Sequence, residues 1–158
     1  MLARGLLAAV VVALLDQLSK FAVLGFFATH AAGYRLVEIT SFFDLVLTYN
    51  HGMSFGLFDR GSGINAILFS LVAAAIIVIL LTWLRRAAHP MLAVAIGLII
   101  GGAVGNVIDR LHLGGVVDFL YFHAGPWYWP AFNLADTAIC LGVAAMLLDG
   151  LLLHRRAH

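Results

Sequence analysis

Four long runs of apolar residues alternate with mixed segments along this chain of 158 residues. The runs cover about residues 6–27, 64–84, 90–108 and 131–153. About 20 predominantly apolar residues are needed to cross the hydrocarbon core of a bilayer. Lipid offers no hydrogen-bond partner to backbone N–H and C=O groups, so each run must be helical. The pattern predicts an all-α polytopic membrane protein, a single membrane-embedded domain with four transmembrane helices.

The mixed segment after the first run, residues 28–63, has a different pattern. From Phe43 to Asn50 a large apolar residue occupies every second position, which is the alternation of a half-buried strand. Residues 34–40 suit a partner strand, and residues 53–58 suit a third one. We therefore expect a small β-sheet between the first two helices, lying at the outer membrane surface.

The other long connection, residues 111–130, joins the third and fourth helices. It contains the adjacent glycines Gly114 and Gly115 and ends in the aromatic run Trp-Tyr-Trp at residues 127–129. Such aromatic side chains suit the headgroup layer, where an apolar ring and a polar edge are both accommodated. We expect this segment to lie at the membrane surface as well.

The arginines indicate how the helices are oriented. If the helices alternate in direction, one side holds Arg4, Arg85, Arg86, Arg155 and Arg156, and the other holds Arg35 and Arg60. Basic residues collect on the cytoplasmic side of membrane proteins. The sequence therefore predicts that both termini are cytoplasmic, and that Asn106, Asp109, Asp118 and Asp136 lie toward the outer face.

The first apolar run imitates a secretory signal peptide. Asp16 and Lys20 interrupt it, however, and no small-x-small cleavage site follows at the right distance. We interpret the run as a retained membrane helix.

Composition agrees with a membrane protein and excludes one class of partner. Hydrophobic residues make up 63% of the chain and charged residues 11%, whereas soluble domains carry about 25% charged residues. The net charge is +1, and no basic run suits nucleic acid. Cys140 is the single cysteine, so the chain cannot form an internal disulfide.

Polar residues nevertheless occur within the predicted helices. An ionised side chain at the bilayer centre costs about 2.5–3.5 kcal/mol on insertion scales. The residues come in pairs three or four positions apart, so each pair shares a helix face: Asp16 and Lys20, Asn106 and Asp109, and Asn133 and Asp136. Exposing three such faces to lipid would be costly, so we expect them to face one another or a wet cleft.

Two of these groups also have a purely structural explanation. Asp16 and Lys20 suit an ion pair that ties the first helix to the others. Asp109 is followed by Arg110 at the end of a predicted helix, where a salt bridge at the interface explains both residues equally well.

The acids near the last helix are ambiguous in the same way. Asn133 suits a helix N-cap, because its side chain accepts from free backbone N–H groups. Asp136 in the first turn gains from the helix dipole. Asp118 has no such explanation, because apolar residues surround it on both sides.

Metal and serine chemistry are poorly supported. His51, His112 and His123 lie on the outer side without the spacing of a metal site, so no metal is expected. Ser54 lacks the G-x-S-x-G context of a serine nucleophile.

A pair of carboxylic acids in a screened, water-accessible cleft offers specific chemistry. Two such groups at close range tend to share one proton. The ionised member accepts a proton from water, while the protonated member donates to a carbonyl oxygen and later to a leaving amine. This is peptide hydrolysis, although two aspartates near one membrane face fit a proton-coupled transporter or channel subunit almost as well. That rival would use Asp16, Lys20, Asp109 and Asp136 as a relay.

Five sequence blocks, spread in order over the full length, resemble the lipoprotein signal peptidase (signal peptidase II) family of bacterial membrane aspartyl proteases. The blocks are Asp16-Gln-Leu-Ser-Lys20, Tyr49-Asn50-His-Gly52-Met-Ser-Phe55, Gly101-Gly-Ala-Val-Gly-Asn106-Val-Ile-Asp109-Arg110, Val116-Val-Asp118-Phe119 and Phe132-Asn-Leu-Ala-Asp136.

The resemblance implies a role for each of these polar residues. Asp118 and Asp136 would be the catalytic dyad, and Asp16 and Lys20 would be structural or supporting. The remaining residues would support the site or position substrate: Asn50, Asn106, Asp109, Arg110 and Asn133.

The resemblance also implies a substrate and a location. The family removes signal peptides from prolipoproteins, cutting just before a cysteine that carries diacylglycerol. It needs no cofactor, is inhibited by globomycin, and works in the bacterial inner membrane with its site toward the periplasm. Its outer β-cradle, which lies on the membrane, agrees with the strand pattern of residues 34–58.

Overall fold

The computed structural model describes residues 1–31, 33–52 and 62–156. Within them, four helices are long and apolar enough to cross a membrane, as the apolar runs predict. They are α1 (Leu2–Ala28), α2 (Ser62–Arg85), α3 (Pro90–Leu113) and α4 (Leu134–Arg156). The chain is therefore a multi-pass membrane protein.

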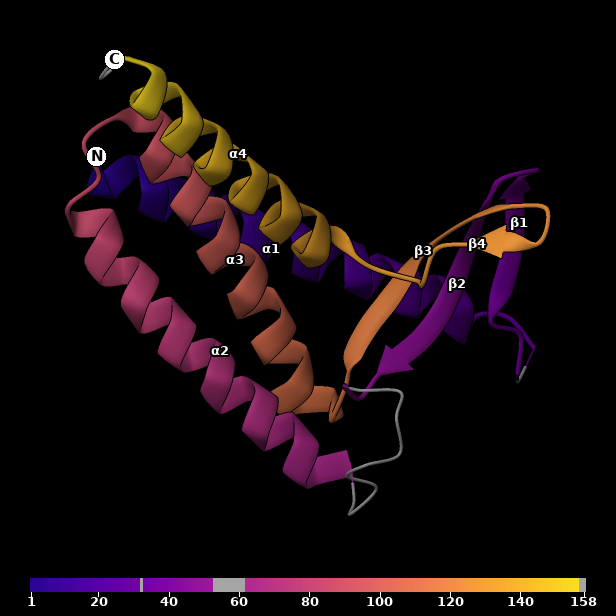
Figure 1. Ribbon diagram of the computed structural model, residues 1–158. Helices are drawn as coiled ribbons and strands as arrows, with labels where there is room; N and C mark the ends of the chain where they lie inside the picture. The colour runs from indigo at the N-terminus through magenta and orange to yellow at the C-terminus, as the bar shows by residue number, and fades with distance from the viewer. Residues whose placement is uncertain (32, 53–61, 157–158) are drawn as a thin grey trace.

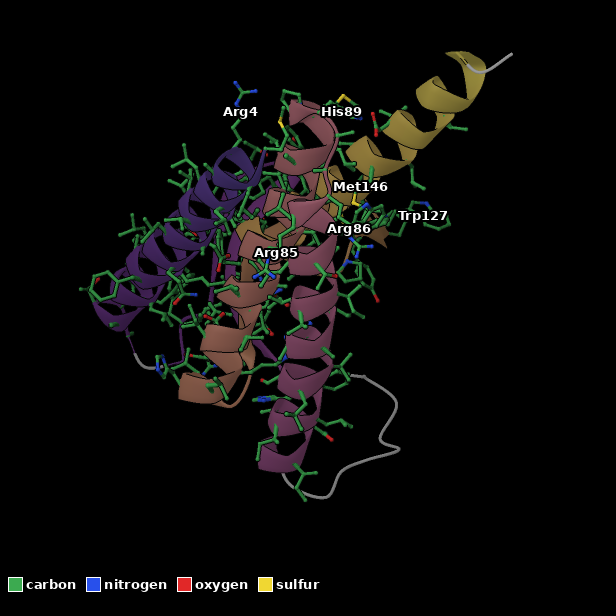
Figure 2. All side chains as sticks on the ribbon, turned by 90° about the vertical axis from the view of Figure 1, so that its left-hand side faces the viewer. Arg4, Arg85, Arg86, His89, Trp127 and Met146 are labelled. Atoms are coloured by element: carbon green, nitrogen blue, oxygen red, sulfur yellow. The ribbon has the colours of Figure 1, made fainter. Side chains whose placement is uncertain are left out.

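Both termini and the turn between α2 and α3 lie at one end of the molecule, and the β-sheet lies at the other (Figure 1). Figure 2 is viewed from the side of the termini, where Arg4, Arg85, Arg86 and His89 lie. This arrangement fits helices that alternate in direction. The cytoplasmic location of this end stays a prediction.

Helix α3 is the most buried of the helices and packs against α1, α2 and α4. Its side chains Ala93 and Ile96 are fully buried, together with Leu84 at the end of α2. Lipid tails are as apolar as these side chains, so their burial stabilises the bundle through close van der Waals packing. The apolar contacts of α3 therefore hold the bundle together away from the polar site.

Glycines let α3 approach its neighbours closely. A Cβ atom added at Gly101 would collide with the backbone of Ala9 in α1, and one at Gly102 would collide with the backbone of Ala135 in α4. A Cβ atom at Gly105 would collide with the Asp16 carboxylate. The close contact of small residues brings the polar side chains of α1 and α3 within hydrogen-bonding range.

The sheet has strand order β1-β2-β3-β4 with antiparallel pairing throughout. Its strands are β1 (Leu36–Thr40), β2 (Phe43–Asn50), β3 (Val116–Ala124) and β4 (Trp127–Tyr128). Val117 and Phe119 of β3 pack against Val23 and Phe27 near the end of α1. This packing fixes the sheet against the helical bundle.

The first two strands confirm the prediction for residues 34–50, whereas the predicted strand at 53–58 lies outside the described residues. The sheet is larger than predicted, because β3 and β4 come from the connection between α3 and α4. The pattern of β3 explains why it was missed: Val116–Phe119 is buried at every position, Asp118 included. A strand that is buried on both faces has no period-2 alternation.

Several helix ends differ from the apolar runs, and two of them have an evident local cause. Helix α3 continues beyond residue 108 to Leu113 and ends at Gly114, whose φ of 74° is the left-handed cap conformation. Helix α4 begins at Leu134, because Phe132 just before it forms backbone hydrogen bonds with Leu120 of β3. Hydropathy alone does not reveal either boundary.

Candidate active site

The two aspartates are brought together by one asparagine. Asp118 comes from β3 and Asp136 from the first turn of α4. Asn133 Nδ2 donates to Asp118 Oδ1 at 2.7 Å, and the Asn133 backbone N–H donates to Asp136 Oδ2 at 3.3 Å. Its side-chain oxygen accepts from the Asp136 backbone N–H at 3.0 Å. Asn133 is therefore both the predicted N-cap of α4 and the bridge between the acids.

Asn106 of α3 supports Asp136 from the other side. Its Nδ2 donates to Asp136 Oδ1 at 2.9 Å. Its Oδ1 accepts from Lys20 Nζ at 3.2 Å and from Asn133 Nδ2 at 3.3 Å. Because a lysine can only donate, it fixes the orientation of the amide and directs the NH₂ group toward Asp136.

Lys20 also forms the centre of a buried ionic cluster. Its Nζ lies 2.7 Å from Asp16 Oδ2 and 2.8 Å from Asp109 Oδ2, so that with Asn106 it uses all three of its donors. The ion pair between Asp16 and Lys20 confirms the prediction from their spacing. The partner of Asp109 in this cluster is Lys20 of α1, so the suggested salt bridge to Arg110 was wrong.

Each carboxylate of the cluster holds the residue that precedes a site aspartate. Asp16 Oδ1 accepts the backbone N–H of Ala135 at 2.9 Å. Asp109 Oδ2 accepts the backbone N–H of Val117 at 3.0 Å. The ionic cluster thus fixes the backbone on which Asp136 and Asp118 are mounted.

Arg110, in the last turn of α3, is a cation close to the pair of acids. Its guanidinium group interacts electrostatically with Asp136, Asp118 and Asp109. It donates to the backbone oxygen of Asn106 at 3.5 Å. A permanent positive charge therefore lies beside the two acids.

Asn50, the last residue of β2, reaches Asp118 from the sheet. The Asn50 side chain forms a hydrogen bond with Asp118. Its Oδ1 accepts the backbone N–H of Gly52 at 2.9 Å, which turns the NH₂ group toward the carboxylate. The neighbouring His51 ring interacts through Nδ1 with the Gly114 carbonyl at 3.1 Å.

A cavity of about 480 Å³ lies in front of Asp118. It is lined by Thr48, Tyr49, Asn50, His51, Gly52, Asp118, Tyr121, Tyr128, Pro130 and Ala131. Its walls are contributed by β2, β3, β4 and the approach to α4. The volume is sufficient for a short stretch of extended polypeptide.

The structure therefore brings together all nine polar residues singled out in the sequence, in one connected network. Gln17 was missed: its side chain donates to Asp109 Oδ1 at 2.8 Å and to the Gly105 carbonyl at 3.2 Å. An amide in an apolar run is itself a signal of an internal partner. The aromatic walls Tyr121 and Tyr128 were also missed, because only the fold places them beside Asp118.

The environment of Asp118 favours its protonated form. The side chain is only 2% exposed. Burial is the main cause that raises the pKa of Asp118, and the negative charge of Asp136 is the second. Hydrogen bonds from Asn50 and Asn133 and the charge of Lys20 lower it, and the resulting pKa is about 6. A carboxylic acid with such a pKa can donate and accept a proton near neutral pH.

This shift predicts a pH-dependent stability. Between the usual pKa of 3.8 and about 6 the folded protein binds a proton at Asp118 that the unfolded chain releases, so folding is penalised as pH rises through this window. The penalty is absent below pH 4 and reaches at most about 3 kcal/mol above pH 6. Replacing Asp118 by Asn removes it. Thermal unfolding in detergent is expected to show the variant gaining stability relative to wild type from pH 4 to 7, and a constant difference would contradict the shift.

Comparison with known proteins agrees with this site. The model of the family described as Signal peptidase (SPase) II matches residues 8–152. A lipoprotein signal peptidase of Methylorubrum extorquens is 44% identical over 147 residues, which cover 93% of this chain and 85% of that protein. One of Paraburkholderia phytofirmans is 47% identical over 146 residues, covering 90% and 81%.

Two solved structures are similar to the whole fold. Both are described as a bacterial membrane enzyme, determined by the in meso method at 2.3 and 1.9 Å resolution. The first is 27% identical with a TM-score of 0.78, and covers 96% of this chain and 89% of its own. The second is 28% identical with a TM-score of 0.80, and covers 96% and 94%. Since the family model spans nearly the whole chain and the relatives are well above 30% identical, this chain belongs to the signal peptidase II family of membrane peptidases.

Proposed function

We propose that this protein is an aspartyl endopeptidase that removes the signal peptide from diacylglyceryl-modified prolipoproteins. The proposed cut lies on the N-terminal side of the lipidated cysteine. The observation that carries the proposal is the bridge from Asn133 to both Asp118 and Asp136 beside an open cavity. Family membership supplies the substrate class, because the relatives are named lipoprotein signal peptidases.

In this mechanism Asp118 and Asp136 share one proton and titrate as a pair. The ionised carboxylate takes a proton from a water molecule, whose oxygen forms a bond to the scissile carbonyl carbon. The protonated carboxyl group donates its proton to the carbonyl oxygen. When the C–N bond breaks, the nitrogen of the cysteine takes a proton from the dyad. One hydroxyl group of the tetrahedral intermediate gives a proton back as the new carboxyl group forms, so the dyad again holds one proton. No covalent enzyme intermediate is formed.

The surrounding residues have supporting roles in this reaction. Asn50, Asn106 and Asn133 hold the carboxylates in fixed orientations through their NH₂ groups. Arg110 stabilises negative charge on the pair and on the bound substrate. Asp16 and Asp109 act indirectly, because their carboxylates hold the backbone N–H groups of Ala135 and Val117. Lys20 in turn holds both of these carboxylates in place.

The location of the site fits a lipid-anchored substrate. A signal peptide is itself a membrane helix, so its cleavage point arrives at the membrane surface, where the diacylglyceryl chains keep it at lipid depth. The site lies at the sheet end of the bundle, away from the termini. With cytoplasmic termini this end faces the periplasm, which places the reaction on the outer face of the bacterial inner membrane. Globomycin-type inhibitors are expected to occupy the same cavity.

The rival transporter model has little support in the cytoplasmic half of the bundle. A proton relay needs polar groups along the whole membrane depth. Asp149 of α4 lies 3.1 Å from His89, the residue just before α3, at the end of the bundle opposite the site. Asp16, Lys20 and Asp109 are joined to one another and to the peptide N–H groups beside the dyad.

The test of the proposal is cleavage by the purified protein in detergent micelles, without any ion gradient and with a metal chelator present. We expect a diacylglyceryl-modified prolipoprotein to be cut, leaving a product that begins at the lipidated cysteine by mass spectrometry. The same prolipoprotein with an unmodified cysteine is the matched control and is expected to remain intact. Failure of the folded wild-type protein to cut the lipidated substrate would overturn the proposal.

A further inference from the structure

Helix α2 places the side chain of Phe69 in the surroundings of the site. Most of its neighbouring positions face outward, since Leu68, Leu71 and Val72 are 50%, 64% and 50% exposed. Phe69 is half-buried. The first turns of α2 run beside the last turns of α3 (Figure 1), and Phe69 contacts Arg110 in the last turn of α3. Its ring therefore points to the end of α3 that carries the polar network.

One contact of the Phe69 ring is with Arg110. The guanidinium carbon lies over the ring, 5.6 Å from its centroid. A planar guanidinium group packs well on an aromatic face and is attracted to it. The ring thus supports a cation that interacts with Asp136 and Asp118.

The other contact is with Gly52. A Cβ atom added at Gly52 would collide with the edge of the Phe69 ring, and the φ of +80° at this position already favours glycine. The backbone N–H of Gly52 is the donor that orients the Asn50 side chain toward Asp118. The ring therefore limits where the turn at Asn50–Gly52 can lie.

From these two contacts we propose that Phe69 is a positioning residue of the active site: one ring supports both Arg110 and the Asn50–Gly52 turn. Through Arg110 it fixes the positive charge beside the dyad, and through Gly52 it fixes the donor to Asp118. Phe69 is not among the residues that line the cavity in front of Asp118, so it acts on the dyad through these two contacts. The readout of this proposal rests on the peptidase activity proposed above.

The main test compares Phe69→Leu with Phe69→Tyr. Leucine removes the flat ring on which Arg110 lies, whereas tyrosine retains it. We expect Phe69→Leu to lower kcat on the order of 10- to 100-fold with KM changed less than about threefold, because small displacements of catalytic groups are costly. Phe69→Tyr is expected to restore most of the activity. Phe21→Leu is the matched control. Phe21 of α1 is 77% exposed, so this substitution is expected to leave kcat unchanged.

A double-mutant cycle separates positioning from general destabilisation. Arg110→Lys keeps the charge but loses the planar group, so its effect and that of Phe69→Leu are expected to be strongly non-additive. Gly52→Ala displaces the same turn from the other side and is expected to reproduce the loss in kcat. If Phe69→Leu does not fold, Phe69→Met takes its place in the same cycle.

Several outcomes would overturn the proposal. One is an unchanged kcat in Phe69→Leu. Another is a double variant whose loss in kcat equals the product of the separate losses of Phe69→Leu and Arg110→Lys. The third is a Phe69→Tyr variant that is no more active than Phe69→Leu. Absence of cleavage by the wild-type protein would instead count against the peptidase function. If the wild-type protein cleaves normally and Phe69→Leu has the same kcat, the result would count against the positioning role alone.

Discussion

Replacing either Asp118 or Asp136 by Asn is expected to abolish cleavage of a lipid-modified prolipoprotein, with kcat/KM reduced by roughly 10³-fold or more. Asparagine has nearly the shape of aspartate, and its Oδ1 can still accept the hydrogen bonds from Asn133 and Asn106. It cannot, however, take a proton from water or deliver one to the leaving nitrogen. The loss is therefore expected in the chemical step rather than in substrate affinity.

The control for this experiment is another buried carboxylate of the same sheet. Asp44 of β2 is 5% exposed and lies 3.2 Å from His123, away from the network at the site. Asp44→Asn is expected to keep its peptidase activity, measured at equal amounts of folded protein by size-exclusion chromatography and thermal unfolding. Full activity in either dyad variant would exclude the proposed mechanism.

Replacing Lys20 by Met is expected to destabilise the protein by about 3–5 kcal/mol. Lys20 is the common partner of Asp16 and Asp109, and all three side chains are at most 3% exposed. Removing the cation leaves two carboxylates facing each other in a buried site, where unpaired charge is very costly. The unfolding temperature in detergent is the measurement, and a loss below about 1 kcal/mol would show that the cluster is not held by charge.

A neutral version of the whole cluster is the matched control. In the triple variant Asp16→Asn, Lys20→Met and Asp109→Asn, no buried charge is left without a partner. Replacing a complete buried ionic group by neutral side chains is often nearly neutral for stability. We expect the triple variant to recover most of the stability that Lys20→Met loses, which would identify uncompensated charge as the cause.

The helices were predictable because the bilayer imposes strong rules on the sequence. Length and hydropathy were sufficient for all four runs, and the spacing of Asp16 and Lys20 was sufficient for their ion pair. The partner of Asp109 was not predictable from its neighbour Arg110. Adjacent residues on a helix point about 100° apart, so the next residue in the sequence is rarely the partner in space.

The site depended on contacts that no local pattern contains. Asp118 sits in an entirely buried stretch of strand, so alternation could not reveal β3 and spacing could not pair Asp118 with Asp136. The resemblance of sequence blocks suggested that pair, and the structure then supplied Asn133 as the connection. Phe69 carried no signal at all, since one phenylalanine in an apolar helix looks like any other lipid-facing residue.

The hydrogen bond from Ala135 to Asp16 joins residues 119 positions apart, and this has a consequence for biosynthesis. The ribosome makes α1 first and α4 last, so Asp136 and its anchor do not coexist until nearly the whole chain has been translated. On the proposed mechanism, the chain gains its peptidase activity only at the end of its own synthesis, when α4 joins α1.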